Sequence, residues 1–178
     1  MLGDVASEVA GGGATVRTMM GPGVDPQLYR ASAGDGALLG QADLILYSGL
    51  HLEGKLGDVL AGFAARTPTV AAAGQAAPPE EVLRTSGGAP DPHVWMDVGL
   101  WRLTVPVIEK ALLEQSSGDE ECASGIPARA AAYEGQLAAL DAWARAALAT
   151  VPERQRVLVT AHEAFHYFGR AYGVQVEG

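Results

Sequence analysis

Cysteine is almost absent from this 178-residue chain, because Cys122 is the only one. A single cysteine excludes an intramolecular disulfide, a cysteine-based zinc site and an iron–sulfur cluster. Long hydrophobic runs are also missing, so no segment is expected to span a membrane as a helix. The first residues, Met1–Gly13, have neither a basic region nor an apolar core, and we therefore expect no export signal in this chain.

Basic residues are scarce as well. The chain has 12 Lys and Arg against 21 Asp and Glu, which gives a formal net charge of −9. Nucleic acids and anionic membrane surfaces need a basic face, so neither is expected as a partner. Hydrophobic residues make up 48% of the chain and charged residues only 19%, which favours a domain with a packed core over a disordered chain.

The sequence does contain an alternation of short apolar runs and helical patterns. The apolar runs predict strands at Thr15–Met20, Leu44–Tyr47, Thr69–Ala72, His93–Met96, Val157–Thr160 and Val174–Val176. The helical patterns predict helices at Met1–Ala10, from Asp25-Pro26 onward, at Gly54–Ala65, at Val98–Gln115 and in the stretch that ends at Tyr172. This alternation is typical of an α/β fold with a mostly parallel sheet.

The second half of the chain opens with a polar linker, 116–126, followed by one long helix. The helix is expected at Pro127–Thr150 and would be roughly 36 Å long at 1.5 Å per residue. Its apolar face is expected to contain Tyr133, Leu137, Leu140, Ala144, Ala147, Leu148 and Val151. A new strand–helix–strand unit begins at Val157, and Gly178 comes before a sheet can be completed, so we expect a truncated protein.

One local motif suggests a zinc hydrolase. His162-Glu163-Ala164-Phe165-His166 fits H-E-x-x-H, in which two imidazoles one helical turn apart hold Zn²⁺ and the glutamate acts as general base. The motif follows an expected strand directly, which puts His162 at a strand–helix junction. Little chain remains to supply a third ligand, so a zinc metallohydrolase is the alternative interpretation.

Two of the four histidines have a different feature in common. His93 and His162 both stand at the ends of expected strands, where ligand sites gather in α/β proteins. The turn at 21–29 is a third strand end of this sort. His51 and Glu53 are interpreted as helix-start and surface groups.

Four segments of the chain carry recognisable motifs: GPGVDPQLY (21–29), ADLILYSGLHLEGK (42–55), DPHVWMD (91–97) and VLVTAHEAFHYFGRAYGVQVEG (157–178). In this order they resemble the metal-binding receptors of ABC importers, the zinc- and manganese-binding solute-binding proteins of the TroA-like and ZnuA-like cluster. The expected long helix lies between the third and the fourth. The resemblance implies a TroA-like helical-backbone receptor, in which a rigid helix joins two α/β lobes and one divalent ion binds between them.

The resemblance implies that His93 and His162 are metal ligands. A further family histidine, in the motif GPGVDPHxY, corresponds to Gln27 in this chain. The family's acidic fourth ligand would lie beyond Gly178, and its first strand would precede Met1. A tetrahedral Zn²⁺ site needs about four ligands, and imidazole is a better donor than a carboxamide oxygen, so we expect weaker binding than in an intact relative.

The same resemblance implies an organisation and a function. We expect an N-terminal α/β lobe at 1–115 without its first strand, a linker and backbone helix at 116–152, and the start of a truncated C-terminal α/β lobe at 153–178. The implied protein is not an enzyme. It is a receptor that delivers Zn²⁺ or Mn²⁺ to an ABC permease in the membrane, from the periplasm or from a membrane-anchored extracellular position. A monomer is expected. The resemblance also includes relatives that belong to a cell adhesion family. The alternatives are the zinc metallohydrolase that uses His162, Glu163 and His166, and a receptor fragment that does not bind metal.

Overall fold

The computed structural model describes residues 1–178 and has the α/β architecture that the sequence predicts. The helices are α1 (Leu2–Ala10), α2 (Ala33–Leu39), α3 (Leu56–Phe63), α4 (Ala72–Ala76), α5 (Val98–Arg102), α6 (Thr104–Gln115), α7 (Glu120–Ala123), α8 (Ile126–Ala149) and α9 (His166–Tyr172). The strands are β1 (Ile45–Tyr47), β2 (Thr69–Ala71), β3 (Val157–Val159) and β4 (Gln175–Glu177). The 3₁₀ turns are η1 (Gly11–Gly13), η2 (Pro79–Glu81), η3 (Val94–Met96) and η4 (Glu153–Gln155).

The strands pair in parallel, as predicted, but in two separate two-stranded sheets. Ile45 of β1 lies opposite Thr69 of β2, and Val157 of β3 lies opposite Gln175 of β4. A helix connects the two strands of each pair, α3 in the first and α9 in the second, as parallel strands require. The carboxyl end of β3 leads directly into the turn that carries His162.

The strand predicted at His93–Met96 is wrong, because this segment forms the 3₁₀ turn η3. The side chain of Asp91 accepts the backbone N–H of His93 at 3.0 Å. A strand would need that N–H for its ladder, so the local side-chain bond favours the turn.

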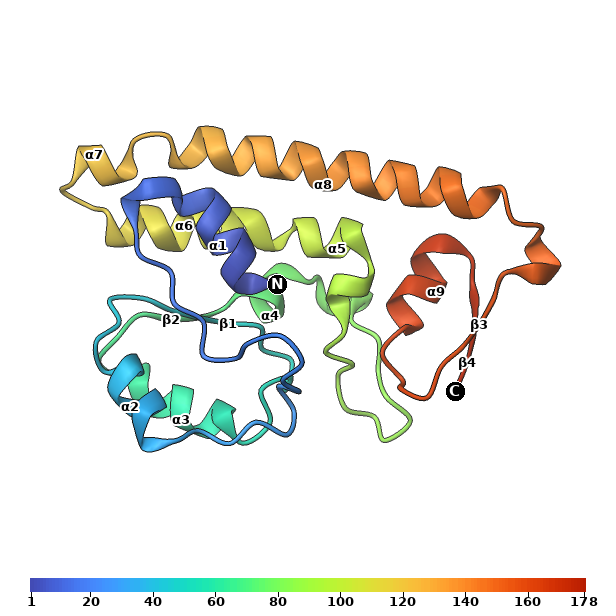
Figure 1. The fold of residues 1–178 in the computed structure, drawn as a ribbon, viewed down its shortest axis with the longest axis horizontal. Helices are drawn as coiled ribbons and strands as arrows, with labels where there is room; N and C mark the ends of the chain where they lie inside the picture. Colours follow the sequence, from blue (N-terminus) through green and yellow to red (C-terminus); the bar gives the residue numbers. More distant parts are fainter.

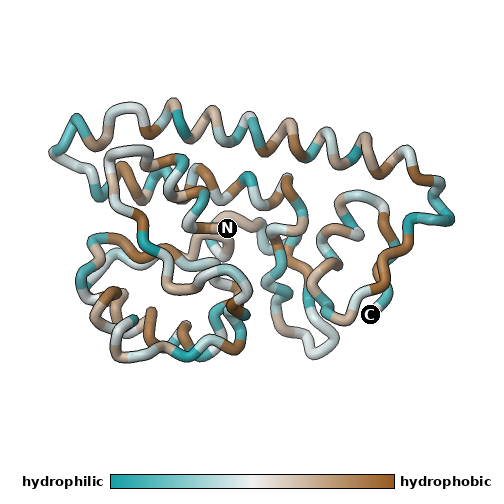
Figure 2. The backbone as a smooth tube through the Cα atoms, in the orientation of Figure 1, coloured by the Kyte–Doolittle hydropathy of each residue, from teal (hydrophilic) through white to brown (hydrophobic).

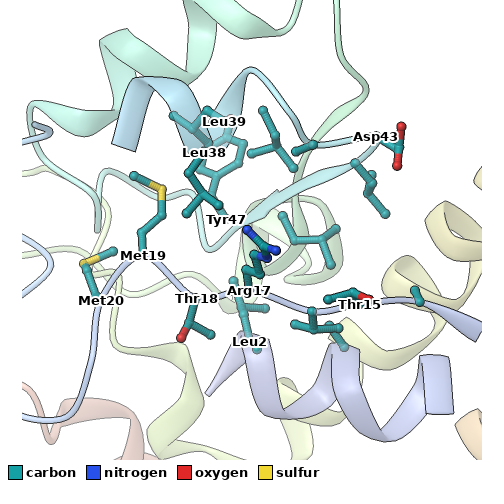
Figure 3. Close-up of a pocket in the computed structure, with 18 of the residues that line it drawn as sticks. Leu2, Thr15, Arg17, Thr18, Met19, Met20, Leu38, Leu39, Asp43 and Tyr47 are labelled. Carbon is teal, nitrogen blue, oxygen red and sulfur yellow. The ribbon is translucent and has the colours of Figure 1, made fainter. Parts of the chain in front are cut away.

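The strand predicted at Thr15–Met20 is also wrong, because the backbone of this segment pairs with no strand. β1 is hydrogen-bonded to β2 alone, and its other edge faces a cavity of about 910 Å³ that Thr15–Met20 also lines. Figure 3 shows Thr15 and Thr18 on one side of this cavity and Leu39 on the other. Alternating side chains therefore do not suffice for a strand here, since a strand needs a backbone partner. The same cavity borders Ser48, whose buried hydroxyl has no hydrogen-bond partner.

The helix predicted from Asp25-Pro26 begins later, at Ala33. Ser32 and Asp35 form a capping box there, in which each side chain accepts the other residue's backbone N–H. Asp25 instead accepts the N–H of Gln27 at 2.8 Å and closes a short turn.

The helix predicted at Val98–Gln115 is divided into α5 and α6 at Leu103. Pro106 explains the division, because proline lacks a backbone N–H and is tolerated only in the first turn of a helix. Helix α6 begins at Thr104 and places Pro106 in that first turn. The polar linker 116–126 contains one short helix, α7.

Helix α8 is the long helix that the sequence predicts, and it runs along one side of the molecule (Figure 1). It packs against α1, α5 and α6, and it buries Ile126, Ala130 and Leu137. The predicted apolar face is wrong at Leu140, which is 46% exposed. No helix combines the length and the apolar character that crossing a bilayer would need.

Further hydrophobic side chains are exposed near the C-terminal end. Trp143 of α8 is 67% exposed, and the strand β3, which Figure 2 shows as hydrophobic, exposes 48% of Val157 and 77% of Val159. Hydrophobic surface is therefore uncovered on both α8 and β3.

The main hydrophobic core joins residues from both ends of the chain. Helices α1, α4, α5, α6 and α8 contribute to it, and Tyr167 of α9 is fully buried in the same cluster. A smaller cluster joins α2, β1 and α3. Helix α9 thus belongs to the same packed unit as the N-terminal helices.

Two tyrosine hydroxyls fix α9 in this position. The hydroxyl of Tyr167 donates to the carbonyl of Asp91 at 2.9 Å and accepts the N–H of Leu83 at 2.9 Å. The hydroxyl of Tyr172 donates to Asp141 of α8 at 3.0 Å. These bonds hold the β3–α9–β4 segment against both α8 and the turn that carries His93.

We predict that Tyr167→Phe lowers the free energy of unfolding by about 1–3 kcal/mol, because it leaves one buried and one partly buried backbone group without a partner. Chemical denaturation monitored by circular dichroism measures the change. Tyr133→Phe is the matched control: its hydroxyl contacts the exposed side chain of Asp4, so its loss should cost less. Equal losses in the two variants would contradict the structural role of Tyr167.

Candidate metal centre

Three turns of the same kind hold the candidate ligand positions. In each turn, a side chain two residues earlier accepts the backbone N–H of the candidate residue. The pairs are Asp25 with Gln27 at 2.8 Å, Asp91 with His93 at 3.0 Å, and Thr160 with His162 at 3.2 Å. Asp and Thr side chains favour this local bond. The sequences D-P-Q, D-P-H and T-A-H therefore each fix the backbone of the residue that could bind a metal ion.

The side chain of His93 is buried, and Asp91 sets its orientation. His93 is 7% exposed and Asp91 is 1% exposed. Nδ1 of His93 lies 2.7 Å from Oδ1 of Asp91. An ionised carboxylate only accepts hydrogen bonds, so Nδ1 carries the proton and donates it. The other ring nitrogen, Nε2, then keeps the free lone pair with which an imidazole binds a metal ion.

The structure brings His162 and His93 together from opposite halves of the chain. Their ring centroids lie 5.2 Å apart, and the ring planes are 86° from parallel. Two imidazoles bound to one tetrahedral Zn²⁺ through bonds of about 2.0–2.1 Å would have ring centres about 5 Å apart. No group of three or more His, Cys, Asp or Glu side chains converges in a way that could hold a metal ion. The two imidazoles therefore have the right separation without a further ligand of these types.

A second histidine approaches the same carboxylate. Nδ1 of His166 lies 3.4 Å from Oδ2 of Asp91, so both oxygens of Asp91 face an imidazole. Burial would raise the pKa of Asp91, but the hydrogen bonds from His93 and the contact with His166 outweigh it and hold the pKa below its ordinary value. Asp91 is therefore an ionised acceptor at neutral pH.

The H-E-x-x-H motif does not form the site that a zinc hydrolase needs. Helix α9 begins at His166, so His162 lies outside the helix and the two imidazoles do not share a helical face. The ring of His162 faces His93, whereas that of His166 faces Asp91. The side chain of Glu163 is exposed.

Gln27 is exposed in the turn after Asp25, and its carboxamide group makes no hydrogen bond to either candidate histidine. The loop that contains Gly54 packs closely against this turn. A Cβ added at Gly54, which has a φ of +49°, would lie 2.6 Å from the carbonyl oxygen of Gln27. Only glycine therefore allows this close approach.

That neighbouring loop also corrects the interpretation of Glu53 as a surface group, because Glu53 is 5% exposed. Its carboxylate accepts the backbone N–H groups of Ser48 at 2.6 Å and Gly49 at 3.1 Å. Burial raises the pKa of Glu53, and these backbone hydrogen bonds offset part of the rise. His51 is exposed, with a φ of +64°, and has no contact with the other histidines.

Sequence reasoning missed Asp91 and Tyr167. The signal for Asp91 was present, since an Asp–Pro pair before a histidine favours a turn in which the Asp side chain accepts the histidine N–H. No local signal exists for Tyr167, because its partners Leu83 and Asp91 lie in a distant part of the sequence.

Two solved structures with a similar fold are named as metal-binding or metal-bound proteins. The periplasmic zinc binding protein TroA from Treponema pallidum matches with a TM-score of 0.94 and 43% identity, over 100% of this chain and 63% of that chain. Fe(III)-bound YtgA from Chlamydia trachomatis matches with a TM-score of 0.85 and 29% identity, over 96% of this chain and 59% of that chain.

Curated relatives agree with the structural matches. The zinc-binding protein TroA of Treponema pallidum is 43% identical over 100% of this chain and 56% of its own length. The manganese-binding lipoprotein MntA of Bacillus subtilis is 43% identical over 99% of this chain and 57% of its own length. This chain thus spans a little over half the length of the curated relatives it matches.

A family model, described as ZnuA, the periplasmic component A of the zinc-uptake complex, matches residues 1–178. The match covers the whole chain, including the turns that carry Gln27, His93 and His162. The resemblance inferred from four sequence segments is confirmed by this match and by the two relatives. The chain belongs to the ZnuA family of metal-binding receptors.

Proposed function

We propose that this chain is the metal-binding part of a receptor for a divalent transition-metal ion, with His93 and His162 as ligands. The observation that supports the proposal best is the 5.2 Å separation of the two ring centroids. The ion would lie between an N-terminal α/β lobe, residues 1–115, and a C-terminal lobe that begins at 153–178. The linker and long helix at 116–152 would join the two lobes.

Gln27 is our third candidate ligand. It occupies the same kind of turn as the two histidines and follows an aspartate that accepts its N–H. A carboxamide oxygen is a weaker donor than imidazole for Zn²⁺, so a site made of these three residues should bind Zn²⁺ weakly. Water would complete the coordination.

The proposed cargo is Zn²⁺ or Mn²⁺. The relatives at 43% identity are named as zinc-binding in one case and manganese-binding in the other. Imidazole ligands bind Zn²⁺ more tightly than Mn²⁺, whereas oxygen ligands suit Mn²⁺. Tighter binding of Zn²⁺ to this chain would therefore follow from its two imidazoles alone.

The proposed role is delivery of the ion to an ABC permease, without catalysis by this chain. The family is described as periplasmic, and MntA is named as a lipoprotein, which supports a periplasmic or membrane-anchored extracellular position. A monomer suits this role, because each chain brings its own pair of imidazoles together. The different orientations of His162 and His166, one facing His93 and the other Asp91, support the absence of a hydrolytic H-E-x-x-H site.

We predict that His93→Ala and His162→Ala each weaken Zn²⁺ binding by at least about 100-fold, because each removes one of two strong ligands. Isothermal titration of the purified chain with Zn²⁺ measures the effect. His51→Ala is the matched control, since it also removes one histidine but leaves both candidate ligands in place, and it should bind like the wild type. Identical binding by all four proteins would remove the site assignment.

We predict that Gln27→His strengthens Zn²⁺ binding by about tenfold or more, a gain of about 1.4 kcal/mol, because imidazole replaces a carboxamide oxygen. Gln155→His adds a histidine at another exposed position and should leave the affinity unchanged. If Gln27→His binds no more tightly than Gln155→His, position 27 does not belong to the site.

A further inference from the structure

One buried carboxylate, that of Asp91, contacts two imidazoles from segments far apart in the sequence, those of His93 and His166. Oδ1 lies 2.7 Å from Nδ1 of His93, and Oδ2 lies 3.4 Å from Nδ1 of His166. His93 precedes η3, whereas His166 begins α9. The side chain of Asp91 therefore connects the two segments whose contact brings His93 and His162 together.

The backbone of Asp91 is held as firmly as its side chain. Its N–H donates to the carbonyl of Leu83 at 2.8 Å, and its carbonyl accepts the hydroxyl of Tyr167 at 2.9 Å. With the residue 1% exposed, the carboxylate has no room to turn toward solvent. The position of each carboxylate oxygen is fixed by the fold.

Both oxygens of Asp91 face a histidine nitrogen. Oδ1 accepts the backbone N–H of His93 as well as the ring Nδ1–H, and Oδ2 faces His166. A carboxylate used in this way orients its histidine and is not free to bind an ion itself. His166, whose Nδ1 is directed at Oδ2, has its ring 46% exposed at the edge of this arrangement.

We propose that Asp91 and His166 are positioning residues for the metal ligand His93, and that neither binds the ion. Asp91 keeps the proton of His93 on Nδ1, so Nε2 is the nitrogen that meets the ion beside His162. Nδ1 of His166, at the start of α9, contacts Oδ2 of Asp91 and restricts the movement of the carboxylate. This inference rests on the proposed function and names residues that would set the affinity of the same site.

The affinity experiment compares Asp91→Asn, His166→Leu and His166→Gln with the wild-type chain, by competition for Zn²⁺ with a chelator at one pH and one salt concentration. Asp91→Asn should bind about 10–100-fold more weakly. His166→Leu should lose at most about fivefold, because a half-exposed polar contact contributes little, and His166→Gln should recover the loss by donating to Oδ2. Asp119→Asn is the control, since Asp119 also accepts a backbone N–H, that of Cys122, and lies outside the site; it should bind like the wild type.

The position of the ring proton of His93, on Nδ1 or on Nε2, separates a positioning role of Asp91 from a packing role, because a loss of packing alone would not change it. Long-range ¹H–¹⁵N correlation NMR of the metal-free wild type should show the proton on Nδ1, and Asp91→Asn should shift part of the population to Nε2. The wild-type spectrum needs no variant to fold, so a proton on Nε2 of His93 would contradict the proposal even where Asp91→Asn is unstable.

Three results would overturn the proposal: a proton on Nε2 of His93 in the wild type, unchanged Zn²⁺ affinity in folded Asp91→Asn, or a loss in His166→Leu as large as that in His93→Ala. The last result would make His166 a ligand. Failure of the wild type to bind Zn²⁺ would instead overturn the proposed function, while the NMR result would still test the orientation of His93 by Asp91.

Discussion

The attachment of α9 to the N-terminal half of the chain determines whether His162 and His93 meet. The hydroxyl of Tyr167 satisfies the N–H of Leu83 and the carbonyl of Asp91, and the tyrosine ring is fully buried. Leaving these two groups unpaired would cost about 1–3 kcal/mol, so one arrangement of the two segments is strongly favoured. A single aromatic residue therefore links the helix that follows His162 to the residue that orients His93.

The parts of the fold that depend on local sequence were predictable. Helix α8 and the strands β1, β2 and β3 begin and end close to the predicted residues, because apolar periodicity and proline positions act over short distances. Thr15–Met20 and His93–Met96 fail for two different physical reasons. The first has the alternation of a strand but no backbone partner, and in the second the Asp91 side chain takes the N–H that a strand would use.

The candidate site was predictable from the sequence only in its ligand positions. Family resemblance named His93, His162 and Gln27, and the structure brings the first two together. The H-E-x-x-H pattern was misleading, because helix α9 begins only at its second histidine. The shared use of Asp91 by His93 and His166 depends on contacts between distant segments, which periodicity does not reveal. The burial of Glu53 has the same cause, since the loop folds back on its own carboxylate.

The central claim is that two imidazoles from opposite halves of the chain bind one ion. X-ray absorption spectroscopy at the zinc edge of the Zn²⁺-loaded chain tests this claim directly, because imidazole rings give outer-shell scattering that oxygen ligands lack. The account predicts two imidazole ligands with Zn–N distances of about 2.0–2.1 Å and oxygen atoms in the remaining positions. A spectrum with oxygen ligands only, or with a single imidazole, would contradict it.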